Sequence, residues 1–435
     1  MNTYEKIIKL AEEYAPELIC QRRDFHRYAE AGWMEMRTSS LIARRLTDLG
    51  YEVLVGDQVC DRDARMGVPS DEVLEEAYHR AVEQGADPEF VKATRGGMTG
   101  VIGILRCGEG PTVAMRFDID ALGVHESHEE DHFPMQQGFV SVNPGVMHAC
   151  GHDGHAVSGL GVAQVLMQIK DQLHGTVKLI FQPSEEGVRG AKSIVEKGHL
   201  DDVDYLLGAH TTGEDSECCD VTPGSTGFLA TTKYDVIYHG KAAHAGAAPH
   251  LGVNAMLAAA TAVLNLQAIP RHGKGATRIN VGRLIAGSGR NVIADEAFLE
   301  MEVRGDTTEL NEYMSEYAMR ILESAAVMHG CTVEVKRMGG AECMVCDLEL
   351  ANRVAQVCRE KLGLKVTESA LYASGGSEDV SYMMNRVRSH GGQATFMRIR
   401  SKVVGGAHNR KFNFDESYIP KSIKVFCAMA CELMQ

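Results

Sequence analysis

The chain has 435 residues, and its 59 acidic side chains outnumber its 44 basic ones, so its formal net charge is −15. This negative charge argues against a nucleic-acid-binding protein, because contacts with phosphate need a basic face. Hydrophobic residues make up 44% of the chain, which is enough for a large core. No apolar run approaches the roughly 18 residues of a membrane span. We therefore expect neither nucleic acid nor a membrane as a partner.

The N-terminus and the cysteines indicate a cytoplasmic protein. Met1 leads directly into an acidic amphipathic pattern, which argues against a signal peptide. The 12 cysteines are scattered along the chain, as is typical of reduced thiols rather than of a disulfide framework. Cys343 and Cys346 form a CxxC pair, but they lack a second pair and a thioredoxin-like context, so we interpret them as ordinary thiols. The adjacent Cys218 and Cys219 receive the same interpretation.

The first half of the chain predicts an α/β domain. Helical periodicity covers residues 3–49, a strand follows at 51–55, and residues 57–98 form a helical insertion. Strands and helices then alternate, with strands at 101–105, 112–117, 177–181 and 205–209 and helices at 156–169 and 191–196. Because these strands are predominantly apolar, helices are expected to cover both faces of their sheet.

The pattern changes near residue 227 and returns near residue 339. The intervening segment predicts strands at 231–238, 276–284, 298–304 and 332–336 and helices at 253–269 and 309–328, which together suggest a compact α+β unit. A helix at 348–362, a strand at 394–399 and a helix at 420–433 follow. We therefore predict a domain of residues 1–226 and 339–435 with a smaller domain, 227–338, inserted in it.

Polar residues follow several of the predicted apolar strands. Asp118 and Asp120 come after the strand at 112–117, Glu185 and Glu186 after the strand at 177–181, and His210 after the strand at 205–209. In open α/β sheets, sites gather outside the carboxyl ends of the strands. Adjacent side chains such as those of the glutamate pair diverge, so one carboxylate can bind a metal ion while the other acts as general base.

A sequence of potential metal ligands precedes the helix at 156–169. Cys150 and His152 lie two residues apart and can face one site from a turn. Together with the strand-end histidine and carboxylates they form a mixed ligand set that suits Zn²⁺ or Mn²⁺. The segment His128–His132 also fits the HExxH zinc pattern, which works only on a helix. It has no apolar residue to bury, so we interpret it as a solvated acidic loop.

These motifs, in this order, resemble the M20 family of metallopeptidases and amidohydrolases, in the branch with a CGHDGH motif. The individual motifs are short, but their order and spacing are specific, and they extend over nearly the whole chain. The matching segments are Arg22–His26, Phe117–Leu122, Met147–His155, Phe181–Glu186, Ala243–Gly246, Asn291–Ile293, Ser377–Asp379 and Ala407–Asn409. The resemblance implies a three-layer, zinc-peptidase-like catalytic domain with an inserted α+β sandwich that serves as lid and dimerisation domain.

The resemblance also implies a pair of divalent ions, Mn²⁺ or Zn²⁺, in each subunit. The ligands carried over from the family are Cys150, His152, Glu186, His210 and His408. Glu185 matches the residue that activates the bridging water, and Asp120 matches the aspartate that orients a metal ligand; Asp118 is expected to assist.

In the inserted domain, the resemblance assigns roles toward the substrate. His244 matches a histidine that reaches the partner subunit's site and stabilises the developing oxyanion. Asn291 and Arg304 match residues that contact the carbonyl and carboxylate of the substrate. We add Arg290 as a second cation for an anionic substrate.

The expected reaction is the metal-dependent hydrolysis of an N-acyl or N-aroyl amino acid, with p-aminobenzoyl-glutamate or a similar acyl-glutamate as substrate. One alternative is a broader N-acyl-amino-acid or indole-acetyl-aspartate-type amidohydrolase. Another, from a different class, is a non-catalytic metal- or peptide-binding relative, although such a protein has no need of Glu185. We expect a homodimer, and the alternative assembly is a hetero-oligomer with a related subunit.

Overall fold

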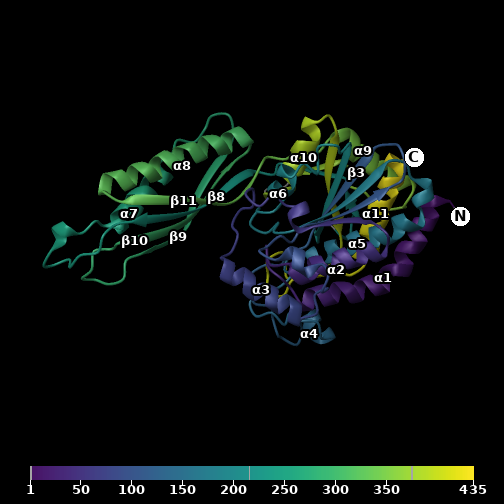
Figure 1. The fold of residues 1–435 in the computed structure, drawn as a ribbon. Helices are drawn as coiled ribbons and strands as arrows, with labels where there is room; N and C mark the ends of the chain where they lie inside the picture. Colours follow the sequence, from purple (N-terminus) through teal and green to yellow (C-terminus); the bar gives the residue numbers. More distant parts are fainter. Residues whose placement is uncertain (1, 215, 374–375) are drawn as a thin grey trace. The chain divides into compact units, whose positions relative to one another are not determined.

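The computed structural model describes residues 2–214, 216–373 and 376–435. Within these ranges the chain folds into two compact units (Figure 1). The first unit combines residues 2–226, 345–373 and 379–435, and the second combines residues 227–344 and 376–378. None of the described helices has both the length and the apolar character that crossing a membrane requires.

The first unit contains a mixed sheet of seven strands. In order across the sheet these are β1 (Glu52–Val55), β2 (Val101–Arg106), β4 (Thr176–Gln182), β3 (Thr112–Asp118), β5 (Tyr205–Thr212), β13 (Gln393–Arg400) and β6 (Val221–Thr222). The central strands β4, β3, β5 and β13 run parallel, and the outer strands pair antiparallel. The carboxyl ends of four neighbouring strands therefore meet at one edge of the sheet.

The first unit also contains α-helices, most of which pack on this sheet or on one another (Figure 1). They are α1 (Thr3–Arg27), α2 (Met36–Asp48), α3 (Asp71–Glu83), α4 (Phe133–Gln137), α5 (His152–Gln168), α6 (Ala191–Glu196), α9 (Leu348–Glu360), α10 (Val380–Ser389) and α11 (Tyr418–Leu433). Helices α1, α5 and α11 pack against one another, whereas α10 packs against α6, β5 and β13. Strands β3 and β4 are buried along almost their whole length, which confirms the prediction of a sheet covered on both faces.

Helix α5 is the central helix of the first unit, and glycines allow its close packing. Its residues from His152 to Leu166 are all buried, as expected for a helix without a polar face. A Cβ atom on Gly159 would lie 2.6 Å from the ring of Phe181, and one on Gly161 would overlap the side chain of Ile423. This packing holds the first residue of α5, a predicted metal ligand, firmly against the sheet.

The second unit is an antiparallel sheet with two helices. Its strand order is β11 (Thr332–Ala341), β8 (Ala230–His239), β10 (Glu296–Gly305) and β9 (Thr277–Ala286). Helices α7 (Ala255–Gln267) and α8 (Thr308–His329) pack against each other and against the sheet. Strand β10 alternates between buried and half-buried residues, as a strand does when one face of its sheet is covered. This arrangement confirms the predicted α+β unit.

Helix α3 confirms the helical character predicted for the insertion 57–98, which also contains short 3₁₀ turns at Gly56–Gln58, where it begins, and at Val91–Thr94. The structure differs from the predicted elements in several other places. The helical segment 3–49 is interrupted between α1 and α2. Strand β11 continues beyond its glycines because Gly339 and Gly340 still pair with β8, so the second unit extends to Met344 rather than 338. Helix α10 has no counterpart among the predicted elements.

Short strand pairs complete the first unit. The parallel pair is β7 (Gly224–Thr226) with β12 (Leu371–Ala373), and the antiparallel pair is β14 (Val403–Val404) with β15 (Asn413–Phe414). The second pair flanks the segment that carries His408, whose backbone has a left-handed φ of 62° and whose N–H donates to the carbonyl of Ala149. This hydrogen bond holds the segment beside the residues that precede α5.

Candidate metal centre and active site

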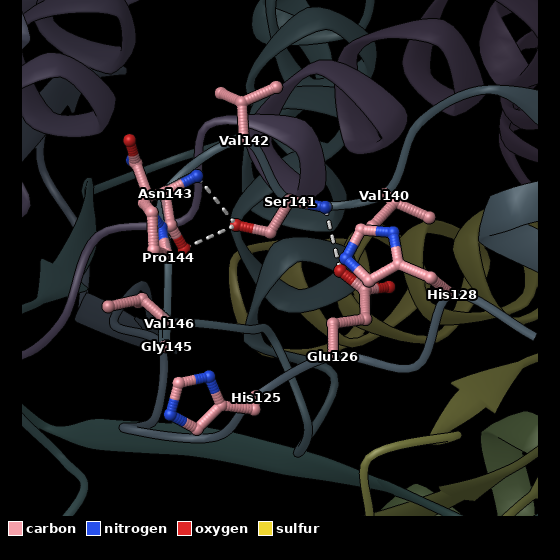
Figure 2. A pocket seen from close by; sticks show the side chains of 10 residues that line it. All are labelled: His125, Glu126, His128, Val140, Ser141, Val142, Asn143, Pro144, Gly145 and Val146. Atoms are coloured by element: carbon pink, nitrogen blue, oxygen red, sulfur yellow. Dashed lines mark hydrogen bonds between the residues drawn. The ribbon is translucent and has the colours of Figure 1, made fainter.

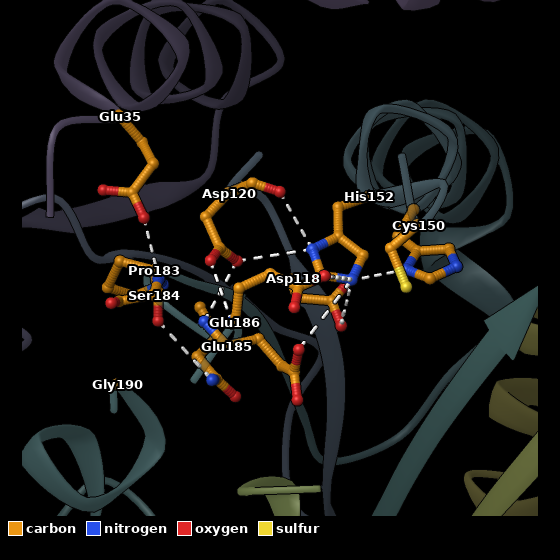
Figure 3. Close-up of polar contacts among 12 residues, drawn as sticks. Glu35, Asp118, Asp120, Cys150, His152, Pro183, Ser184, Glu185, Glu186 and Gly190 are labelled. Carbon is orange, nitrogen blue, oxygen red and sulfur yellow. Dashed lines mark hydrogen bonds and ion pairs between the residues drawn. The ribbon is translucent and has the colours of Figure 1, made fainter. Parts of the chain in front are cut away.

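The structure brings the predicted metal ligands of the first unit together at the carboxyl edge of the sheet. Figure 3 shows three of them, Cys150, His152 and Glu186. The ligand atoms of Cys150, His152 and His210 lie within 4.8 Å of one another. Those of Cys150, Glu186 and His408 meet the same limit. The two groups share Cys150, so the arrangement offers two neighbouring positions for cations.

The two histidines His152 and His210 are oriented by their own hydrogen bonds. Nδ1 of His152 lies 2.9 Å from the backbone oxygen of Asp120, and Nδ1 of His210 lies 2.7 Å from that of Thr211. Since a carbonyl only accepts, each Nδ1 carries the proton and leaves the lone pair on Nε2. Nε2 of His210 is 3.4 Å from Sγ of Cys150, and Nε2 of His152 is 3.9 Å from a carboxylate oxygen of Glu186.

Two buried atoms of the cluster indicate which kind of ligand it can bind. Nε2 of His152 and Oε1 of Glu186 are buried and have no hydrogen-bond partner among the described residues. Buried polar atoms are normally satisfied, and a lone pair and a carboxylate oxygen that face each other are both satisfied by a cation. The chemistry of the donor set therefore fits a divalent metal ion.

The charges of the cluster lead to the same conclusion. Burial raises the pKa of the Cys150 thiol and of the Glu186 carboxyl, and burial lowers the pKa of His210 to about 3. Burial also acts to lower the pKa of His152, but the charge of Asp118 and the hydrogen bond to Asp120 outweigh it and raise this pKa well above its usual value, so a metal ion bound at Nε2 would take the place of a proton there. The anionic groups need positive charge nearby, which a divalent ion supplies.

Asp120 connects the ligands with the glutamate pair. Its Oδ1 accepts the backbone N–H of Glu185 at 3.0 Å, and its Oδ2 accepts that of Glu186 at 2.9 Å. Its backbone oxygen accepts the Nδ1–H of His152. The carboxylate of Glu185 is buried, with one oxygen 4.0 Å from Nε2 of His152. One aspartate thus sets the positions of the predicted base and of two predicted ligands (Figure 3).

Asp118 contacts a different set of partners. It pairs with Arg116 at 2.5 Å, and its other oxygen lies 2.5 Å from Nδ1 of His155. Nε2 of His155 accepts the backbone N–H of Thr211 at 3.0 Å, next to His210. Burial acts to raise the pKa of Asp118, but Arg116 and the two nearby histidines hold it well below its usual range. Asp118 therefore remains ionised and braces the strand that carries His210.

The remaining predicted residues lie in the second unit. His244 is exposed, and its Nδ1 accepts the backbone N–H groups of Gly246 and Ala247 at 3.1 and 3.0 Å, which leaves the ring proton on Nε2 as an outward donor. An isolated β-bridge joins His244 to Val292, and this bridge places Asn291 next to it.

The two predicted substrate cations also lie in the second unit. Arg290 is exposed. Arg304 is half-buried, and two of its nitrogens donate to the carboxylate of Glu302 at 3.0 and 3.1 Å. An anionic substrate that binds Arg304 must therefore share it with this carboxylate or displace it.

Among the cavities in the first unit, two are lined by residues that the sequence indicated. One of about 460 Å³ adjoins the cluster through Cys150 and His210 and is lined further by Val403, Ala407 and Phe412. The second, of about 700 Å³, follows the segment 125–146, and Figure 2 shows Glu126 accepting a hydrogen bond from the backbone of Ser141. The first of these cavities offers a place for a substrate next to the ligands.

The segment with the HExxH pattern is not helical, because α4 begins only at Phe133. The structure confirms that it is no helical zinc motif, but it is not wholly solvated either. His132 and Glu126 are both buried, and Nε2 of His132 lies 2.9 Å from Oε1 of Glu126. The same oxygen lies 2.9 Å from His26, whose other nitrogen contacts Asp153 beside the predicted ligand His152. No pattern in the sequence indicates this network, since His26 lies 100 and 127 residues from these two carboxylates.

Residues 114–432 of the chain match the sequence model of peptidase family M20/M25/M40. The chain is 44% identical to the indole-3-acetyl-aspartic acid hydrolase of Enterobacter agglomerans over 95% of each chain. It is 42% identical to one of the subunits of the p-aminobenzoyl-glutamate hydrolase of Escherichia coli (strain K12) over 98% of each chain. The solved structure of the aminobenzoyl-glutamate utilization protein from Klebsiella pneumoniae matches with a TM-score of 0.82 and 37% identity, covering 98% of this chain and 97% of that one.

These similarities confirm the predicted fold, an α/β catalytic-type domain with an inserted α+β domain. The region matched by the family model contains the whole candidate metal cluster, from Asp118 to His408. The order of the motifs, the geometry of the cluster and the family match agree, and the chain belongs to peptidase family M20/M25/M40.

Proposed function

We propose that this protein is a metal-dependent amidohydrolase that releases an acidic amino acid from an N-acyl or N-aroyl group, with p-aminobenzoyl-glutamate as its preferred substrate. The observation that carries the proposal is the buried Glu185, held by Asp120 next to a cluster of metal-ligand type. Family membership and the hydrolases among its relatives support an enzyme over a non-catalytic binding protein.

We assign the ligands of two divalent ions to the five side chains of the cluster, which are Cys150, His152, Glu186, His210 and His408. Bound ions supply Lewis acidity, which polarises the scissile carbonyl and makes a water molecule more acidic. The thiolate favours Zn²⁺, and the carboxylates also suit Mn²⁺. Elemental analysis of the purified protein distinguishes between these two metals.

The side chains then perform the proton transfers. The Glu185 carboxylate takes a proton from the attacking water and donates it to the leaving amine, because it is the carboxylate of the adjacent pair that we do not assign to a metal ion. Asp120 fixes the positions of Glu185 and His152 relative to each other through its three hydrogen bonds. We assign the oxyanion contact to Nε2–H of His244, acting in the site of the second copy of a dimer.

The preference for an acidic amino acid rests on the second unit. Arg290, Arg304 and Asn291 are the groups that we assign to the carboxylates and the carbonyl of the substrate. In a protein of net charge −15 these arginines provide the local positive charge that an anionic substrate needs. The chain is about equally identical to an indole-3-acetyl-aspartic acid hydrolase and to a p-aminobenzoyl-glutamate hydrolase. An indole-acetyl-aspartate substrate is therefore the principal alternative.

A substrate panel tests the proposal. The protein, loaded separately with Zn²⁺ and Mn²⁺, is assayed for release of the free amino acid from p-aminobenzoyl-glutamate, p-aminobenzoyl-aspartate, indole-acetyl-aspartate and an N-acetyl aliphatic amino acid. We expect the largest kcat/KM for p-aminobenzoyl-glutamate and loss of activity with a chelator. A preference for indole-acetyl-aspartate would support the alternative, and absence of hydrolysis with metal bound would refute the enzyme proposal.

We propose further that two copies associate through the second unit. Strand β9 is one of the two outer strands of its sheet, and it exposes Leu284 and Ile285. Helix α7, which packs beside β9, exposes Leu257 and Leu264. Pairing of two such edges would cover this apolar surface. Light scattering on the isolated chain distinguishes a homodimer from a monomer that needs a related second subunit.

A further inference from the structure

The loop that carries the glutamate pair has an unfavourable backbone conformation. This segment, residues 183–191 and here termed the acidic loop, follows β4 and leads into α6. Ser184 has a φ of 53° and Val188 a φ of 59°, although neither is glycine. Residues with a side chain rarely adopt the left-handed region and keep it only when surrounding contacts hold them there. The neighbours of the acidic loop must therefore hold it in this conformation.

Two carboxylates hold the middle and the end of the loop. Asp120 accepts the N–H groups of Glu185 and Glu186. At the far end of the loop, Oδ2 of Asp379 accepts the N–H groups of Gly190 and Ala191 at 3.0 and 2.9 Å. Neither carboxylate contacts the backbone N–H of Ser184, which begins the first turn.

The first turn is held by Glu35, a residue far away in the sequence (Figure 3). Glu35 lies just before α2 and is fully buried. Its Oε1 accepts the backbone N–H of Ser184 at 2.7 Å, and its Oε2 accepts the hydroxyl of Thr99 at 2.7 Å. The segment between α1 and α2 packs closely on the loop, since a Cβ atom on Gly32 would lie 2.5 Å from Oγ of Ser184.

We propose that Glu35 is a positioning residue for the general base: by holding the N–H of Ser184 it fixes the strained turn directly before Glu185 and so aims the Glu185 carboxylate. The inference rests on the proposed function of Glu185. Glu35 touches neither the cluster ligands nor the cavity beside them, so its effect passes through the backbone of the acidic loop.

Replacement by alanine and by glutamine separates positioning from charge. Burial, together with the charge of Asp120, raises the pKa of Glu35 to about 8, so a neutral side chain of the same shape is a fair substitute. Glu35→Gln keeps an oxygen for the N–H of Ser184 and presents an amide N–H to the hydroxyl of Thr99, whereas Glu35→Ala removes both contacts.

Glu30 offers a matched control. It is also a buried glutamate, only 2% exposed, and it also accepts two backbone N–H groups, those of Arg37 and Thr38 at 2.9 and 2.8 Å. These hydrogen bonds hold the start of α2 rather than the acidic loop. Glu30→Ala therefore reproduces the loss of a buried carboxylate without the loss of the contact to Ser184.

The experiment measures kcat and KM of the metal-loaded variants on the best substrate of the panel. We expect Glu35→Ala to lower kcat about 10- to 100-fold, as removal of supporting groups commonly does, with KM within about threefold of wild type. Glu35→Gln and Glu30→Ala should keep kcat within about threefold. An equal loss in Glu30→Ala, or a loss in Glu35→Gln as large as in Glu35→Ala, would overturn the proposal.

Hydrogen exchange on the same proteins needs no turnover and separates this proposal from the proposed function. Peptides covering residues 183–190 should exchange faster in Glu35→Ala than in wild type or Glu30→Ala, and unchanged exchange would refute the role of Glu35 even if hydrolysis is found. If the wild type hydrolyses no substrate, the proposed function fails. The exchange result still shows whether the contact of Glu35 with Ser184 holds the acidic loop. If Glu35→Ala does not fold, Thr99→Val, which removes only the anchoring hydroxyl, should show the same change in weaker form, and its absence would refute the proposal.

Discussion

The two units of this protein hold their functional candidates in opposite ways. In the first unit, Asp120, His152 and Glu185 are buried and joined to one another by hydrogen bonds through side chains and backbone. In the second unit, His244 and Asn291 are exposed, and a backbone β-bridge between His244 and Val292 joins the two segments that carry them. Buried polar groups need complete partners, whereas exposed ones can wait for a ligand in water.

This difference agrees with the roles that we propose for the two sets, proton transfer in the first unit and contact with the substrate in the second. A group that transfers protons must be held within a fraction of an ångström, and burial among fixed partners achieves this. A group that contacts the substrate only when it arrives has to be accessible beforehand. Changes in the first unit should therefore affect turnover together with stability or metal content, and changes in the second unit should affect turnover or binding alone.

The largest effect is expected for Glu185→Gln. The glutamine keeps the size of the side chain but cannot take a proton, so kcat should fall about 10³- to 10⁴-fold. Bound metal, measured by elemental analysis, should stay at the wild-type level because Glu185 is not an assigned ligand. Glu196→Gln, an exposed position on the helix that follows the same loop, is the control and should behave as wild type. Near wild-type turnover in Glu185→Gln would rule out the proposed base.

A smaller but cleaner effect is expected for His244→Ala. Loss of one oxyanion donor should lower kcat about 10²- to 10³-fold. Because His244 is exposed, the melting temperature and the metal content should not change. His250→Ala removes another exposed histidine six residues along the chain and should keep full activity. A fall in metal content, or an equal loss of turnover in His250→Ala, would break the contrast between the two units.

The sequence predicted the cluster of the first unit for a simple reason. The runs of β3, β4 and β5 are mostly apolar, and a chemically distinctive residue lies at or shortly after the end of each, so Asp118, Glu185 and His210 could be placed at one edge of a sheet. Predicted boundaries are less accurate where a glycine suggests the end of a strand, as at Gly339, which continues in β11.

The supporting residues could not be predicted in this way. Glu35 and Asp379 accept backbone N–H groups of a loop that lies 149 and 189 residues away in the sequence, and such partners have no local pattern. Glu126 and His132 lie in a segment without apolar residues, so nothing indicated that they are buried. Their partner His26 comes from α1, and only the tertiary structure brings them together.

The smallest expected effect concerns the stability of this last network at acid pH. Burial acts to raise the pKa of Glu126, but hydrogen bonds from His132 and His26 outweigh it and lower the pKa to about 2. A folded-state pKa below the unfolded value of about 4.3 stabilises the protein above pH 4.3. That contribution disappears as the pH falls toward 2.

Thermal unfolding of the metal-free protein between pH 7 and pH 3 checks this expectation. Glu126→Gln should lower the melting temperature by several degrees at pH 7, and its difference from wild type should shrink as the pH approaches 3. Glu130→Gln, an exposed position in the same segment, should show little difference at any pH. A difference for Glu126→Gln that stays constant or grows in acid would contradict the assigned charge of this carboxylate.

One close contact in the acidic loop has a consequence for how natural variants of this protein are interpreted. A Cβ atom on Gly190 would overlap the backbone oxygen of Pro183, and a main-chain atom cannot rotate away as a side chain can. Any other residue at this position would displace the turn before Glu185, although the sequence would still contain every proposed metal ligand and the proposed base. A homologue with such a change would look complete in an alignment of functional residues and still be inactive, so this glycine belongs among the positions that decide whether an enzyme of this type is functional.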